Sequence, residues 1–164
     1  MKSFTPELYL RFNSDNRTAA SKAHDDWESA IEKYRRNLDR IRHRLSPSAR
    51  RLSKSLCLHD ALYLGLARPK IPRLPHSIAV LATRKNSTVF LLVYTLAKEP
   101  RVEDSRHRWP FSKRNVHWLY DEFDIEPNGD LSHAILLSDG RSIVIDFKDV
   151  QLIKDHRDAS LDVA

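Results

Sequence analysis

The sequence contains very little cysteine and glycine. Cys57 is the only cysteine, and three glycines occur among the 164 residues. One cysteine excludes an intrachain disulfide and any cysteine-rich metal site. So few glycines exclude the glycine-rich loops that hold nucleotide phosphates. Because Leu56 and Leu58 flank Cys57, we expect its thiol to be buried.

Long hydrophobic runs are also missing. The longest, about Val89–Ala97, is far shorter than the roughly 20 apolar residues that cross a bilayer as a helix. Near the start of the chain, Pro6, Glu7 and Arg11 interrupt any apolar segment of the kind found in secretory signals. The sequence therefore predicts a soluble, cytoplasmic protein with no membrane partner.

Signatures of catalysis are absent too. The sequence has no GxSxG nucleophile elbow, no HExxH zinc motif and no Walker loop. Cys57 lacks the basic surroundings of a reactive thiolate, apart from nearby His59. We therefore predict no catalytic residue, no metal ligand set and no cofactor.

Positive charge is abundant and is concentrated in one segment. Residues 33–54 contain nine Lys or Arg residues, with Asp39 as their only acid. Residues 1–32 contain four basic and six acidic residues, and residues 55–164 contain fifteen of each. The net charge of +6 therefore comes from one segment, which indicates a local binding surface rather than a uniformly basic protein.

An apolar stripe runs through the same segment and predicts a helix over about residues 16–45. Its members recur every three or four positions, so they share one helix face. They are Trp27, Ile31, Tyr34, Leu38, Ile41 and Leu45. Ser46 and Pro47 then suit the N-cap and the first position of a short helix over about residues 47–56.

Apolar and alternating runs after residue 58 predict about six strands, with a Pro-rich connector at residues 67–76 and a turn at residues 85–87. The clearest unit is a hairpin with Asp139-Gly140 at its turn, a pair typical of two-residue type I′ loops. Such a loop places Leu136 opposite Ile143 and His133 opposite Asp146. The face that carries Leu136 and Ile143 is apolar, so we expect it to meet the helices.

These elements predict an α+β fold in a single domain, residues 1–164. The long N-terminal helix and the short helix fall within about residues 14–56. We expect them to pack on a mainly antiparallel meander sheet of about six strands within about residues 58–153.

Several short segments together resemble a family of small bacterial proteins classed as a domain of unknown function. They are MKSFTPELY at the start, the helix with Trp27 and Tyr34, Leu58-His59-Asp60, WLYDE at residues 118–122 and HAILLSDG at residues 133–140. The resemblance implies no activity and transfers no catalytic residue. In layout, the chain is also similar to some small α+β immunity proteins of bacterial toxin systems.

Two histidines and two aspartates form a polar cluster of candidate residues. An adjacent pair such as His59-Asp60 occurs in metal phosphohydrolases, but it equally suits a turn held by a hydrogen bond. His133 and Asp146 are expected to form a cross-strand polar pair. Further nitrogen and oxygen ligands are nearby in the sequence, although their spacing matches no metal motif. They are His117, Asp121 and Asp124.

The basic residues are the main candidate site. One row lies on a flank of the apolar stripe and continues along the short helix: Lys33, Arg36, Arg40, Arg44, Arg50, Arg51 and Lys54. Such a row suits an acidic protein surface or nucleic-acid phosphates. It also suits a solvated helix, because acids in the first half and bases in the second match the helix dipole. Glu32 and Asp39 can also pair with neighbouring arginines.

No aromatic residues alternate with these arginines, so a base-stacking platform is not indicated. We therefore predict a non-catalytic module that binds another macromolecule, with an acidic protein as the leading partner. Nucleic-acid binding is the alternative, and a metal-dependent hydrolase that uses His59, Asp60 and His133 is the third hypothesis.

Overall fold

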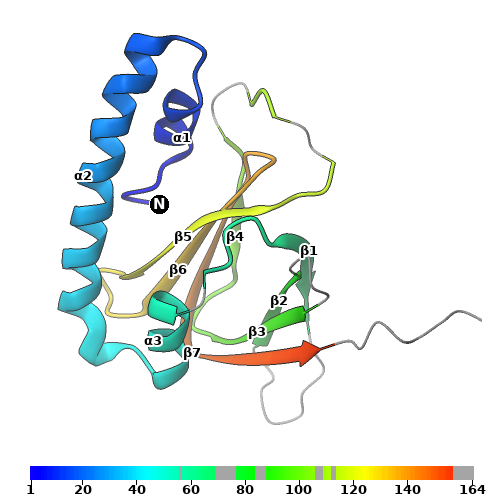
Figure 1. Cartoon of the computed structure of the whole chain (residues 1–164). Coiled ribbons are helices and arrows are strands. Elements are labelled where there is room, and N and C mark those ends of the chain that lie inside the picture. The colour runs from blue at the N-terminus through cyan, green and yellow to red at the C-terminus, as the bar shows by residue number, and fades with distance from the viewer. Residues whose placement is uncertain (56, 69–76, 84–87, 106–108, 112–113, 157–164) are drawn as a thin grey trace, which may run out of the picture.

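The helices come first in the chain and the strands follow, so the predicted α+β fold class is confirmed (Figure 1). A computed structural model describes residues 1–55, 57–68, 77–83, 88–105, 109–111 and 114–156. The predicted Pro-rich connector, apart from residues 67 and 68, and the predicted turn at residues 85–87 lie outside these ranges.

The helical part is made of α1 (Pro6–Phe12), α2 (Arg17–Ile41), a 3₁₀ turn η1 (Arg42–Arg44) and α3 (Pro47–Ser55). The predicted long helix begins where Asn16 Oδ1 accepts the backbone N–H groups of Thr18 and Ala19. Ser46 caps α3 as expected, because its Oγ accepts the N–H of Ala49. None of the helices in the described ranges is both long enough and apolar enough to cross a membrane.

Helix α1 was not predicted, although its start carries a clear signal. Thr5 caps it through a hydrogen bond from the N–H of Leu8, and Pro6 occupies the first helical position. Thr5-Pro6 is the same signal as Ser46-Pro47. Helix α1 packs on the N-terminal half of α2 around Phe4, Leu8 and Trp27.

The strands form one antiparallel sheet in the order β1-β2-β3-β7-β6-β5, with β4 added to β7. Their bounds are β1 Leu62–Ala67, β2 Ser77–Thr83, β3 Thr88–Leu96, β4 Arg101–Glu103, β5 Trp118–Ile125, β6 Leu131–Leu137 and β7 Ser142–His156. Strand β7 has 15 residues, and its two halves join the β1-β2-β3 meander to the β5-β6 hairpin.

The sheet curls until its two edge strands meet. The N–H of Trp118 donates to the Ala61 carbonyl and the N–H of Tyr63 donates to the Val116 carbonyl, each at 2.8 Å. This closure satisfies backbone groups that an open edge would leave exposed. The enclosed core is large and apolar, and Leu38 and Ile41 of α2 join it from one end.

The predicted register of the β6–β7 hairpin is wrong by one residue. The loop has three residues, 138–140, because the N–H of Leu137 donates to the Arg141 carbonyl and that of Gly140 to the Leu137 carbonyl. The predicted type I′ turn requires a positive φ at both Asp139 and Gly140. Gly140 has one, at 90°, but Asp139 does not, so the turn is not type I′. A one-residue shift exchanges the two faces of β6 relative to those of β7. Ile135 and Ile143 therefore face each other in the core.

The prediction of a buried thiol is also wrong, because Cys57 is exposed. It lies between α3 and β1, where Leu58 is buried in the core instead.

Candidate partner-binding surface

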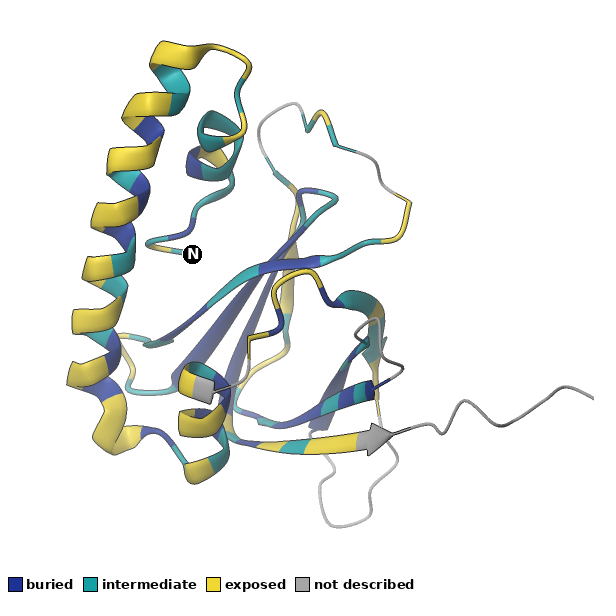
Figure 2. Cartoon of the chain, viewed as in Figure 1, coloured by how far each residue is buried: buried dark blue, intermediate teal, exposed yellow. Residues whose placement is uncertain are grey.

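The seven basic residues of the predicted row are all exposed and lie on consecutive helical elements. Lys33, Arg36 and Arg40 come from α2, Arg44 from η1, and Arg50, Arg51 and Lys54 from α3; we call this set the basic surface. Figure 2 shows exposed residues along the outer side of α2 and around its end into η1 and α3. Apolar side chains such as Leu38 and Leu52 hold the helices on the core, which leaves the charged sides free.

The charge of the basic surface is hardly neutralised by the described residues. Among them, only Arg40 has a carboxylate oxygen within 4.0 Å, that of Asp124, at 4.0 Å. Glu32 and Asp39 form no such contact with a described arginine. Intrahelical pairing therefore does not account for this concentration of positive charge.

Two arginines of the basic surface are held by other parts of the fold. Arg44 Nη2 donates to the carbonyl of Gly129, in the β5–β6 turn, at 2.7 Å. Arg40 Nη2 donates to Asn37 Oδ1 at 2.7 Å, and Asn37 Nδ2 donates to Asp124 Oδ1 at 3.2 Å. The other five side chains of the basic surface form no hydrogen bond with the part of the chain that the structure describes.

Asp124 is the link between β5, α2 and the start of the chain. Its carboxylate accepts Asn37, the N–H of Ile125 and the ammonium of Lys2. Burial raises the pKa of Asp124, but these hydrogen bonds together lower it by a larger amount. The pKa therefore lies below its ordinary value. The ionised form therefore stabilises this junction.

We expect Asp124→Asn to lower the free energy of unfolding by about 1 kcal/mol at pH 7. Because the pKa of Asp124 is lower in the folded protein, its ionised carboxylate stabilises the fold at pH values above the unfolded pKa of about 3.9. This stabilisation is lost as the pH falls through the pKa of the folded protein. Urea unfolding at pH 7 and pH 3 should therefore show a smaller difference from wild type at pH 3. Exposed Asp25→Asn is the control, and an equal effect of both variants at pH 7 contradicts the prediction.

The four residues of the predicted polar cluster are not brought together. His59 and Asp60 are neighbours at a turn, with Nε2 and Oδ2 3.5 Å apart. Strand register places His133 opposite Ile145 and Ser132 opposite Asp146, so His133 and Asp146 point to opposite faces of the sheet. The predicted cross-strand pair is therefore wrong, because the register of β6 on β7 differs by one residue from the predicted register.

Inside the sheet, His133 belongs to a polar network that sequence reasoning missed. Its Nε2 lies 3.0 Å from Asp121 Oδ2, and its Nδ1 lies 2.7 Å from the hydroxyl of Tyr94. In the tautomer whose Nε2–H donates to the Asp121 carboxylate, Nδ1 accepts from the Tyr94 hydroxyl. Burial raises the pKa of Tyr94 well above its usual value, with the Asp121 charge adding to the effect. The ring of His133 also stacks on Phe123, with centroids 4.0 Å apart.

Asp146 is held on the outer face by basic side chains. Arg101 Nη1 donates to Asp146 Oδ2 at 2.8 Å, and Lys98 Nζ lies 3.9 Å from the same oxygen. The hydrogen bond to Asp146 raises the pKa of Arg101. Tyr94 and His133 are fully buried, so this network and the Asp146 pair hold the fold rather than a substrate.

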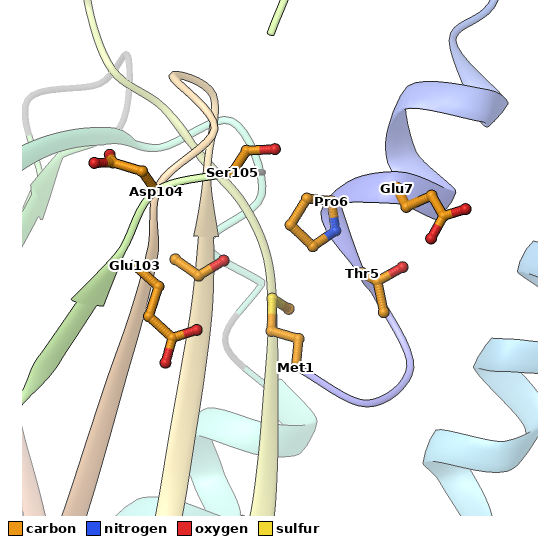
Figure 3. A pocket seen from close by; sticks show the side chains of 8 residues that line it. Met1, Thr5, Pro6, Glu7, Glu103, Asp104 and Ser105 are labelled. Carbon is orange, nitrogen blue, oxygen red and sulfur yellow. The ribbon is translucent and has the colours of Figure 1, made fainter. Parts of the chain in front are cut away.

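The described residues contain no group of three or more His, Cys, Asp or Glu side chains arranged to hold a metal ion. A cavity of about 360 Å³ lies between the start of the chain and β4 (Figure 3). Glu7, Glu103 and Asp104 line it without any basic side chain. Because these acidic side chains would repel it, we do not expect an acidic partner of the basic surface to bind in this cavity.

Comparisons with known proteins do not identify a relative. No protein-family model matches the chain, and the searches of curated proteins and of solved structures found no match. The resemblance to a bacterial family of unknown function stays a prediction.

Proposed function

We propose that the protein is a non-catalytic binding module whose basic surface docks an acidic face of a partner protein. The supporting observation is the exposed positive charge on α2, η1 and α3, which the described carboxylates leave almost unpaired. A local, uncompensated charge of one sign accelerates encounter with a partner of opposite charge and orients it.

One feature favours protein over nucleic acid. The basic surface includes no aromatic side chain on which a base could stack.

Charge reversal at Arg36 and Arg51 tests the proposal. Neither side chain forms a hydrogen bond or ion pair with the described residues, so Arg36→Glu/Arg51→Glu should change the unfolding free energy by less than about 1 kcal/mol. We expect at least a tenfold loss of affinity, of the order found for charges that face an oppositely charged partner. The measurement is capture of partners from the native host, followed by the affinity of the identified partner for each variant.

Lys22→Glu is the matched control, because Lys22 is exposed on α2 outside the basic surface. Equal partner affinity of wild type and the Arg36/Arg51 variant overturns the proposal. Tight binding to duplex DNA, with a log–log salt slope of about −0.9 for each phosphate contacted, favours the nucleic-acid alternative instead.

A further inference from the structure

The basic surface contains two kinds of arginine. Arg36, Arg50 and Arg51 extend from the helices without hydrogen bonds to the described residues, whereas Arg40 and Arg44 are each fixed by one. Each fixed guanidinium uses one N–H of its five, so four donors remain in a set orientation. A side chain that is already ordered loses less conformational entropy when a ligand binds.

The positions of Arg40 and Arg44 define a spacing. They are four residues apart at the end of α2 and in η1, which places them about 6–7 Å apart along the helical axis. Carboxylates at positions i and i+4 of a partner helix are separated by about 6 Å. A guanidinium binds a carboxylate through two parallel hydrogen bonds, which an ammonium cannot do.

We infer that Arg40 and Arg44 form the anchor of the basic surface and bind two carboxylates one helical turn apart on an acidic helix of the partner. This inference rests on the proposed function and assigns different roles within it. Asn37 is a positioning residue, because it holds Arg40 and is itself held by Asp124. Lys33, Arg36, Arg50, Arg51 and Lys54 attract the partner through their charge without a fixed geometry.

Arginine-to-lysine exchange separates geometry from charge. The probe is a fluorescein-labelled alanine-based helical peptide with glutamates at i and i+4, and its isomer carries the same number at i and i+2. Arg40→Lys/Arg44→Lys keeps the net charge but loses the bidentate contacts, so we expect about a five- to twentyfold weaker affinity for the i, i+4 peptide. Arg36→Lys/Arg50→Lys is the matched control and should stay within about twofold of wild type.

Fluorescence anisotropy at one fixed salt concentration gives these affinities, and thermal melts check that each variant is folded. Equal binding of wild type and Arg40→Lys/Arg44→Lys overturns the anchor, while a loss on charge reversal at Arg36 and Arg51 still supports the basic surface. Equal affinity of wild type for the two peptides also overturns the anchor. Failure of wild type to bind either peptide overturns the anchor. If wild type still binds an acidic protein, and Arg36→Glu/Arg51→Glu binds that protein at least tenfold more weakly, the proposed function stands.

Discussion

Gly140→Ala should lower the free energy of unfolding by about 2–4 kcal/mol and the Tm by roughly 5–15 °C. Two effects combine. Gly140 has φ +90°, a conformation that costs an alanine about 1–2 kcal/mol, and its added Cβ would lie 2.7 Å from Cδ2 of Trp109. The indole cannot move freely, because its Nε1 donates to the Ser138 carbonyl at 2.7 Å. Thermal and urea unfolding measure the effect.

Gly129→Ala is a matched control for the backbone term. Gly129 also lies in a hairpin turn at φ +90°, but its added Cβ would approach only the Arg44 guanidinium, at 3.6 Å. It should therefore cost only the strain of about 1–2 kcal/mol. In a Trp109→Leu background, Gly140→Ala should cost no more than Gly129→Ala. Equal destabilisation by the two glycine variants in the wild-type background contradicts the prediction that the contact with the Trp109 indole adds to the cost of Gly140→Ala.

Removing either side of the Tyr94–His133 hydrogen bond should destabilise the protein strongly. Tyr94→Phe leaves Nδ1 of a fully buried histidine without a donor, which costs about 1–3 kcal/mol. His133→Leu leaves the Tyr94 hydroxyl without an acceptor and Asp121 without one of its donors, so we expect about 2–4 kcal/mol. The double variant replaces both polar partners, and its cost should be smaller than the sum by at least about 1 kcal/mol.

The measurement is a double-mutant cycle from urea unfolding. Tyr63→Phe is the control, because Tyr63 is only partly buried and its hydroxyl forms no hydrogen bond with the described residues. It should change the unfolding free energy by less than about 0.5 kcal/mol. Strictly additive costs of Tyr94→Phe and His133→Leu contradict the network, since they mean that the two side chains do not stabilise each other.

Sequence reasoning worked where a signal involves residues close together in the chain. The Ser46 cap acts on an N–H group three residues ahead and starts a helix as predicted. The apolar stripe of α2 also packs inward, although Ile31 and Tyr34 are only partly buried. The N-terminal half of this stripe packs on α1 and also on Tyr120 of β5. The missing element was α1, because a helix of seven residues has too few turns to show a periodicity.

The candidate site was predictable in composition but not in organisation. Periodicity placed the basic residues on exposed helix positions, and the structure agrees. It could not distinguish Arg40 and Arg44 from their neighbours. Their contacts reach Asp124 and Gly129, which are more than 80 residues away in the chain.

The sequence by itself determined the fold class, the long helix, the positive φ of Gly140 and the segment that carries the net charge. Each depends on residues within a few positions of one another or on composition alone. Only the tertiary structure decided the register of β6 on β7 and the partner of His133. The first depends on a loop over which Trp109 packs from outside the hairpin, and the second on Tyr94, 39 residues away. Such contacts form only when the sheet closes, and a one-residue change of register is enough to exchange core and solvent faces.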